Sequence, residues 1–155
     1  MNEDTVSIPH LLAATRTVAV VGLSAKAERP SHGVAQYLQH HGYRIIPVNP
    51  TYAGTYILGE HCYPTLTQAA AALAEKGVAI DLVDCFRRPE HMPAVVEEAI
   101  AVRARGVWMQ LGVVNQAAAQ RARAAGLAVV MDRCVKIEHM NAASEIAELR
   151  AKLQS

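Results

Sequence analysis

The sequence predicts an α/β domain in which helices cover both faces of a doubly wound, five-stranded parallel sheet. Three observations support this prediction: short apolar runs recur along the chain, segments with helical spacing lie between them, and most connections are short. Strands that alternate with helices pair in parallel through right-handed crossovers. We expect the spatial strand order 3-2-1-4-5, and the 155 residues suit a single domain over residues 1–155.

The five predicted strands are short apolar runs, which is the pattern of strands buried on both faces of a parallel sheet. The first run ends in Gly22, a residue that permits a tight turn into the following loop. In chain order, the predicted strands span residues 17–22, 43–48, 80–85, 107–110 and 127–131.

Helices are predicted where apolar residues recur at a spacing of three or four. The first begins at Pro30 with Ser31 near its N-cap and ends at Gly42. A second follows the capping box of Thr65 and Gln68 and ends before residue 77. Two more are expected over residues 92–104 and between residues 115 and 126, and a closing amphipathic helix carries Ala142, Ile146, Leu149 and Leu153.

Residues 49–64 follow neither the helical nor the strand period. They are rich in proline, glycine and tyrosine, so we expect a long functional or lid-like loop. The tyrosines of this segment, Tyr52, Tyr56 and Tyr63, either cover part of a ligand or pack on the surface of the domain.

The charge balance and the apolar runs limit the classes of partner. The chain has 15 Lys and Arg against 14 Asp and Glu, a net charge of +1, which argues against nucleic-acid binding. The apolar runs are far shorter than the roughly 18 to 20 residues that cross a membrane. Residues 1–7 contain Glu3 and Asp4 but no Lys or Arg, unlike a secretory signal, so we expect a cytoplasmic location and no membrane association.

The cysteines and histidines show no metal-ligand spacing. The three cysteines, Cys62, Cys85 and Cys134, are expected to be free thiols in a reducing compartment. Cys134 follows the fifth predicted strand, where it either exchanges disulfides with a ligand thiol or is a half-buried thiol without a role. No histidine has a second histidine four residues away, and no metal site is predicted.

Polar residues follow the predicted strands, at the edge where ligands bind in doubly wound sheets. After the first strand, Gly22 allows close approach of the backbone, Ser24 supplies a hydroxyl, and the helix near Ser31 supplies free amides, which together suit a phosphate. Basic residues follow the first and third strands and suit a phosphomonoester in addition to a diphosphate: Lys26, Arg29, Arg87 and Arg88.

This loop differs from the dinucleotide fingerprint. Of its three glycines only Gly22 is present, with Ser24 and Ala27 at the other two positions. The second strand ends in Asn49 rather than in the acidic residue that binds the ribose of NAD. A diphosphate with a separate phosphate describes coenzyme A, and ordinary NAD binding is disfavoured.

Two residues near the strand ends have alternative interpretations. Trp108 lies within the fourth strand and is interpreted as a core residue. Asp84 could act as a general base, but an aspartate at a strand end also commonly caps a turn, and no catalytic triad accompanies it.

Several motifs resemble those of the small stand-alone CoA-binding domain family, which is Rossmann-like and similar to the CoA-binding domain of the succinyl-CoA synthetase alpha subunit. The resemblance covers residues 17–139, where the motifs occur in a consistent order. They are Gly22-Leu23-Ser24, Arg29-Pro30-Ser31, Tyr37-Leu38, Gly42-Tyr43, Pro47-Val48-Asn49-Pro50, Asp84-Cys85-Phe86-Arg87-Arg88, Trp108-Met109-Gln110-Leu111-Gly112 and Met131-Asp132-Arg133-Cys134.

The resemblance implies that coenzyme A lies across the strand ends. The residues it implies as phosphate-binding are Gly22, Ser24, Lys26, Arg29 and Ser31. It implies that the nucleotide is bordered by Asn49 and Pro50, that adenine and phosphate are flanked by Phe86, Arg87 and Arg88, and that the opposite wall is formed by Gln110, Leu111 and Gly112.

The resemblance does not imply a reaction. The synthetase alpha subunit carries its phosphorylated histidine in a second domain, and we expect no such domain here and therefore no catalysis. Two alternatives stay open: the nucleotide-binding module of an acyl-CoA ligase or transferase system, and a degenerate NAD(P)-dependent oxidoreductase. A homodimer or an unidentified protein partner is also compatible with the sequence.

Overall fold

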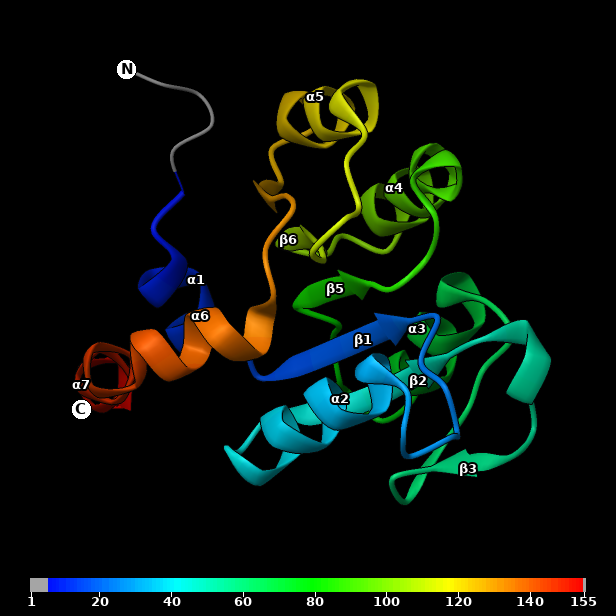
Figure 1. Cartoon of the computed structure of the whole chain (residues 1–155), viewed down its shortest axis with the longest axis horizontal. Coiled ribbons are helices and arrows are strands. Elements are labelled where there is room, and N and C mark those ends of the chain that lie inside the picture. Colours follow the sequence, from blue (N-terminus) through cyan, green and yellow to red (C-terminus); the bar gives the residue numbers. More distant parts are fainter. Residues whose placement is uncertain (1–5, 155) are drawn as a thin grey trace.

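Strands and helices alternate along the chain in the computed structural model, which describes residues 6–154 (Figure 1). All five predicted strands form, each within two residues of its expected bounds. The strands are β1 (Thr17–Val21), β2 (Arg44–Val48), β3 (Tyr56–Ile57), β4 (Glu60–His61), β5 (Leu82–Cys85), β6 (Gly106–Met109) and β7 (Ala128–Val130). The α-helices are α1 (Ile8–Ala14), α2 (Pro30–His40), α3 (Leu66–Ala74), α4 (Met92–Ala101), α5 (Gln116–Ala124), α6 (Val135–Asn141) and α7 (Ala143–Gln154), with 3-10 turns η1 (Pro50–Tyr52) and η2 (Pro89–His91).

The five long strands form one parallel sheet in the order β2-β1-β5-β6-β7. The α/β class and the doubly wound parallel sheet are confirmed. The order differs from the predicted 3-2-1-4-5 at one strand, because the third predicted strand, β5, lies between β1 and β6 instead of outside β2.

The position of β2 at the edge has a physical reason in Pro47. Proline has no backbone N–H, so a strand outside β2 would lack a ladder hydrogen bond there. The outer edge is covered instead by Tyr63, whose amide donates to the Pro47 carbonyl at 3.0 Å and whose carbonyl accepts from the Asn49 amide at 2.9 Å.

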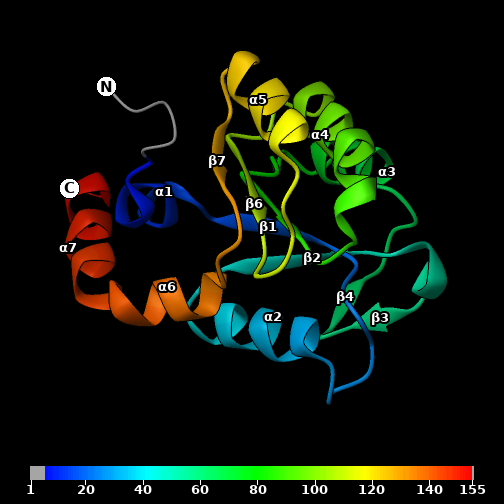
Figure 2. The ribbon, with the colours of Figure 1, turned by 45° about the horizontal axis from the view of Figure 1, so that its top comes forward.

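Helices cover both faces of the sheet, as predicted (Figure 2). On one face, α3, α4 and α5 pack against Ala19 and Val21 of β1 and their neighbours. On the other, α1, α2, α6 and α7 pack against Val18, Val20 and Trp108. Trp108 is fully buried and its Nε1 donates to the Arg133 carbonyl at 2.8 Å, which confirms its assignment to the core.

The helix ends agree with the sequence at α3 and differ at α2. The Thr65 hydroxyl caps α3 by accepting from the Gln68 amide at 3.1 Å, as the capping box predicts. The N-cap of α2 is Arg29, not Ser31. The Ser31 hydroxyl instead accepts from the Ser24 amide at 3.0 Å and ties the preceding loop to the helix.

Residues 49–64 are more structured than the predicted loop. They contain η1 and the antiparallel pair β3 and β4, and Ile57 and Cys62 are buried. The C-terminal segment also differs, since it forms two helices, and Leu153 is 63% exposed rather than packed. No helix within residues 6–154 is both long and apolar enough to cross a membrane.

Candidate functional site at the ends of the central strands

The crossovers reverse direction between β1 and β5. The chain leaves β1 toward β2 at one edge and then crosses back to β5 on the other side of β1. In doubly wound sheets the ligand site lies at such a switch point, outside the carboxyl ends of the strands. Here the two strand ends are in register through Val21 and Cys85, and the Phe86 amide donates to the Val21 carbonyl at 2.8 Å.

Gly22 is the residue that allows the strand ends to meet this closely. Its φ is +92°, and its amide donates to the Val48 carbonyl of β2 at 2.8 Å. A β-carbon on residue 22 would lie only 2.5 Å from the carbonyl oxygen of Phe86. Glycine is therefore required both by the backbone conformation and by the space available.

The first of two cavities at this edge, called cavity I, has a volume of about 360 Å³. It lies beside the N-terminus of α2, whose first turn can supply backbone amides to an anion. Most of the predicted phosphate and nucleotide residues come together here. Its walls are formed by Gly22, Ser24, Lys26, Arg29, Pro30, Ser31, Asn49, Thr51, Tyr52 and Phe86.

Several polar side chains of cavity I hold the loops in place. The Ser24 hydroxyl accepts from the Lys26 amide at 3.1 Å, which stabilises the turn after β1. The Asn49 amide group donates to the Leu23 carbonyl at 3.1 Å, and its oxygen accepts from the Thr51 amide at 3.0 Å. Asn49 thus connects the end of β2 to the loop after β1 and positions the border of the cavity.

A second, larger cavity, called cavity II, has a volume of about 570 Å³ and shares Pro30 and Phe86 with cavity I. It contains the predicted residues after β5 and β6. Its walls are formed by Pro30, Val34, Phe86, Arg87, Arg88, Pro89, Gln110, Leu111, Gly112, Val113, Cys134 and Ile137.

The far wall of cavity II is fixed by hydrogen bonds from distant positions in the chain. The Gln110 side-chain oxygen accepts from the Val135 amide at 3.1 Å and so satisfies the N-terminus of α6. The Asp132 carboxylate accepts from the Gly112 amide at 2.7 Å. These bonds connect the loop after β6 to the segment that carries Cys134.

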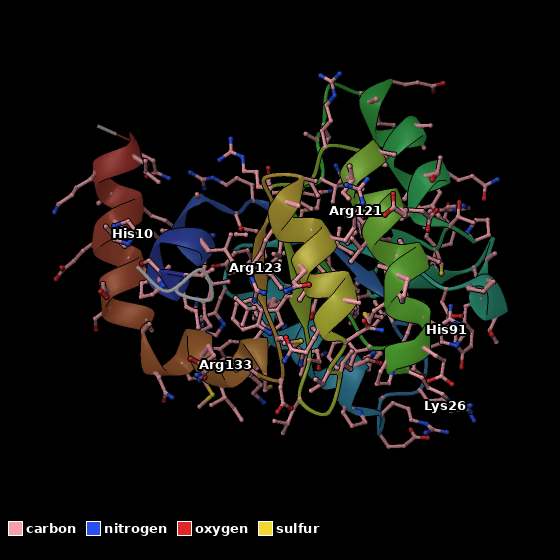
Figure 3. All side chains as sticks on the ribbon, turned by 90° about the horizontal axis from the view of Figure 1, so that it is seen from above. His10, Lys26, His91, Arg121, Arg123 and Arg133 are labelled. Atoms are coloured by element: carbon pink, nitrogen blue, oxygen red, sulfur yellow. The ribbon has the colours of Figure 1, made fainter. Side chains whose placement is uncertain are left out.

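Four basic side chains border the two cavities. Lys26 and Arg29 line cavity I, and Arg87 and Arg88 line cavity II. Figure 3 shows Lys26 at the outer margin of the molecule, on the loop between β1 and α2. No hydrogen bond or ion pair joins these four side chains to any residue between 6 and 154.

Three other arginines form ion pairs. Arg44 pairs with Glu60 at 3.1 Å. Arg121 of α5, labelled in Figure 3, pairs with Glu97 of α4 at 2.8 Å. The Arg133 side chain lies 3.6 Å from the carboxylate of Glu138. The unpartnered cations at the cavities therefore provide positive charge that an anionic ligand can neutralise.

Pro50 is the one predicted site residue that lies outside both cavities. It lines a neighbouring cavity of about 300 Å³ on the side of α3 and α4, together with Thr65, His91 and Arg87. Arg87 thus borders this cavity as well as cavity II.

The cavities also contain residues that the sequence did not single out. Pro30 is adjacent to predicted residues, and Thr51 belongs to a turn within the expected loop. Tyr52, one of the three tyrosines that the sequence offered as a cover for a ligand, lies in the same turn and lines cavity I. Val34 lies on the buried stripe of α2, and Ile137 lies on α6, a helix that was not predicted. Helical spacing of apolar residues had placed Val34 on a predicted helix, but no sequence pattern pointed to Ile137 as a site residue.

Asp84 lines neither cavity. Its side chain is fully buried, both carboxylate oxygens lack a hydrogen-bond partner among residues 6–154, and desolvation raises the pKa of this carboxyl well above its ordinary value. The turn-capping role considered for Asp84 is therefore wrong, and a general base sealed from both cavities is not supported by this geometry.

The cysteines differ in accessibility. Cys62 and Cys85 are buried, and desolvation raises the pKa of both thiols. Cys134 is half-buried and lines cavity II. Within the described part of the chain, no three or more His, Cys, Asp or Glu side chains gather in a metal-binding arrangement.

Comparisons with known proteins identify similar chains. A family model described as "CoA binding domain" matches residues 16–140. The protein YneT of Bacillus subtilis (strain 168) is 39% identical over 138 residues, which cover 89% of this chain and 96% of YneT.

Solved structures resemble this one over most of the chain. A hypothetical protein from Pyrococcus horikoshii OT3 has a TM-score of 0.79 and 35% identity, over 89% of this chain and 93% of that protein. RSP, a Rex-family repressor in complex with β-NADH, has a TM-score of 0.54 and 14% identity over 90% of this chain and 64% of RSP, which is a similarity of fold alone.

Proposed function

The chain belongs to the CoA-binding domain family, and from this premise we propose that it binds coenzyme A across cavities I and II, without catalysis of its own. The observation that carries the proposal is a set of four cations, Lys26, Arg29, Arg87 and Arg88, which have no partner within residues 6–154 and line two neighbouring cavities at the switch point. The ligand that this arrangement favours is a nucleotide with more than one anionic group.

Cavity I supports binding of the diphosphate. Its groups are of the types that recognise phosphate oxygens: a lysine, an arginine, and the amide end of an eleven-residue helix. Gly22 leaves room for a phosphate to approach the backbone at the end of β1. Each charge-assisted hydrogen bond contributes roughly 1.5 to 3 kcal/mol, so two or three of them can hold an anion on a chain of nearly zero net charge.

The residues after β5 support recognition of the rest of the nucleotide. Phe86 borders both cavities, and an aromatic side chain at this position suits contact with adenine. Arg87 and Arg88 follow it directly, and a guanidinium can bind the separate phosphomonoester of coenzyme A in a forked geometry. This second phosphate distinguishes coenzyme A from a simple dinucleotide.

Two features argue against NAD binding and against acid-base catalysis by this chain. The end of β2 carries Asn49 instead of a carboxylate, and both polar groups of its side chain are occupied by Leu23 and Thr51, so the usual ribose partner of NAD has no counterpart. Asp84, the strand-end carboxyl, lines neither cavity, which supports a binding role rather than acid-base chemistry.

Titration calorimetry tests the proposal. Coenzyme A, dephospho-coenzyme A, NAD and ATP would each be titrated into the protein under the same salt conditions. We expect coenzyme A to bind most tightly, with dephospho-coenzyme A weaker by about ten-fold because one or two charge-assisted bonds are lost. Absence of heat with coenzyme A at millimolar concentration, or equal affinity for NAD, would overturn the proposal.

A further inference from the structure

The side chain of Gln110 is almost fully buried, but only one end of its amide group has a hydrogen-bond partner. Gln110 follows directly after β6, is 4% exposed, and lines cavity II. Its side-chain oxygen accepts from the Val135 amide at 3.1 Å. The side-chain nitrogen carries two N–H donors, and neither of them donates to a residue between 6 and 154. Buried amide groups of native proteins are seldom left unpartnered, so this free end requires an explanation.

The bond to Val135 determines which end of the Gln110 amide is free. A backbone N–H can only donate, so the atom of Gln110 that faces it must be the oxygen, and a flipped amide would set donors against a donor. The nitrogen is therefore the free end. It is unpartnered without being sealed from solvent, unlike the two carboxylate oxygens of Asp84. Because Gln110 lines cavity II, this nitrogen is a donor that the cavity can offer to a ligand.

The polar side chains of cavity II are suited to a ligand that accepts hydrogen bonds. Arg87 and Arg88 carry donors only, and the oxygen of Gln110 is already occupied. Apart from Cys134, the remaining side chains of the cavity contain only carbon. Adenine combines flat apolar faces with three ring nitrogens that accept hydrogen bonds, N1, N3 and N7, so its chemistry complements these walls.

We infer that Gln110 donates a hydrogen bond from its amide nitrogen to a ring nitrogen of the adenine. This bond makes cavity II selective for a base with an unprotonated ring nitrogen at that position. The inference rests on the proposed function, because it assigns a contact of the base that the proposed function places beside Phe86. Gln110 then has two separate roles, since its oxygen holds the start of α6 and its nitrogen recognises the base.

Deaza analogues of adenosine 3′,5′-bisphosphate test the inference. The parent compound carries the adenine and the separate phosphate of coenzyme A, and each analogue replaces N1, N3 or N7 by a C–H group. Each analogue therefore lacks one acceptor. Calorimetry should show that one analogue binds about three- to ten-fold more weakly than the parent, because one hydrogen bond is lost, and that the other two bind about as tightly as the parent.

Two variants assign the lost bond to Gln110. Gln110→Met removes the donors and the acceptor, whereas Gln110→Glu removes the amide donors but keeps an oxygen that can accept from Val135. Any effect of the added charge is the same for parent and analogue, so it cancels in the ratio of their affinities. This ratio should fall to about one in both variants. Gln120→Met is the control and should keep the ratio, because Gln120 is exposed on α5 and lines neither cavity.

The possible results separate the inference from the proposed function. Equal affinities of the parent and all three analogues would overturn the inference and leave nucleotide binding intact. A weaker affinity for every ligand in Gln110→Met, with an unchanged ratio, would show that Gln110 acts only by holding α6, and would also overturn the inference. If neither adenosine 3′,5′-bisphosphate nor coenzyme A gave heat at millimolar concentration, both the inference and the proposed function would fail.

Discussion

The carbonyl oxygen of Phe86 lies so close to Gly22 that a β-carbon on residue 22 would be 2.5 Å from it. The contact joins the end of β1 to the end of β5 at the switch point of the sheet, where both cavities meet Phe86. The close approach of two backbone segments therefore fixes the geometry of the candidate site.

Gly22→Ala should destabilise the protein more than a substitution that introduces backbone strain alone. Gly126→Ala is the matched control, since Gly126 has the same φ of +92° but open space around its α-carbon. We expect each variant to lose about 1–3 kcal/mol of unfolding free energy from the left-handed conformation, with a further loss in Gly22→Ala from the clash with a backbone oxygen. Urea denaturation measures both, and equal losses would mean that the loops after β1 and β5 separate easily.

Arg29→Ala and Arg88→Ala should weaken coenzyme A binding in different ways. Removing a charge-assisted bond costs about ten-fold in affinity or more. Because Arg29 lies beside the amide end of α2, its loss should affect coenzyme A and dephospho-coenzyme A equally. Arg88→Ala should affect coenzyme A more, since Arg88 is assigned to the separate phosphate.

Lys76→Ala is the control for these charge removals. Lys76 is exposed after α3, before the amino end of β5, and therefore lies toward the opposite edge of the sheet. The Lys76→Ala substitution removes one positive charge, and Lys76 lines neither cavity. If calorimetry gave the same loss for Lys76→Ala as for Arg29→Ala, the effect would be one of net charge and the phosphate assignment would fail.

Cys134 should be the cysteine that reacts with an alkylating reagent in the folded protein, because Cys62 and Cys85 are buried and burial raises the pKa of both thiols. Since Cys134 lines cavity II, saturating coenzyme A should slow its alkylation several-fold. Mass spectrometry after treatment with iodoacetamide measures the rate. An unchanged rate at saturating ligand would exclude Cys134 from the neighbourhood of the bound coenzyme.

The central strands could be predicted from sequence because burial on both faces produces uninterrupted apolar runs such as Val18 to Val21. The order of the strands in the sheet was harder to predict, because an apolar run locates a strand but does not show which other strands lie next to it. One indicator was present. Pro47 within the second strand suits an edge position and so argues against a further strand outside β2.

The parts of the site that escaped prediction depend on contacts between distant positions. Tyr63 pairs with the edge of β2 only because the intervening residues fold back as η1, β3 and β4, which are too short to show a period. Helix α6 is seven residues long, and its N-terminus is satisfied by Gln110, 25 positions earlier. The strand-end residues of cavities I and II were predictable because the topology of a doubly wound sheet brings them to one edge.

His139 gives the domain a stability that depends on pH. Its side chain is 5% exposed, and its Nδ1 is 2.8 Å from the hydroxyl of Tyr37. Burial, together with nearby His41 and Arg150, lowers the pKa of His139 below its ordinary value of 6.5. The unfolded chain therefore binds more protons than the folded chain just below pH 6.5, and stability falls as the pH falls through that range.

Substitution of His139 by glutamine should remove this dependence. Glutamine retains a polar group that can bond with Tyr37 but does not titrate. Urea denaturation at pH 5.5 and 7.5 should show a smaller loss of stability on acidification for His139→Gln than for the unmodified protein. The same loss in both proteins would assign the acid sensitivity to other groups.

Asp84 should make the stability of the protein depend on pH in the opposite sense to His139, so that stability falls as the pH rises. Desolvation raises the pKa of its buried carboxyl well above the ordinary value of 3.8, so the folded state holds a proton that the unfolded state releases. The contribution of this carboxyl to the free energy of unfolding is complete below about pH 3.8, and it is lost as the pH rises toward the pKa of Asp84 in the folded protein. As the pH rises across this range, the unmodified protein loses stability and Asp84→Asn does not. The stability of the variant relative to the unmodified protein should therefore increase by up to about 1.4 kcal/mol per pH unit.

Urea denaturation at pH 5, 6 and 7 measures that slope. Asp84→Leu should show the same slope with a different constant offset, because both substitutions remove the titrating group but leave different atoms between Val20 and Trp108. The offset reports packing and hydrogen bonding, whereas the slope reports ionisation alone. A stability difference that stays constant over these pH values in both variants would mean that Asp84 is ionised in the folded protein, and would require a partner for its charge.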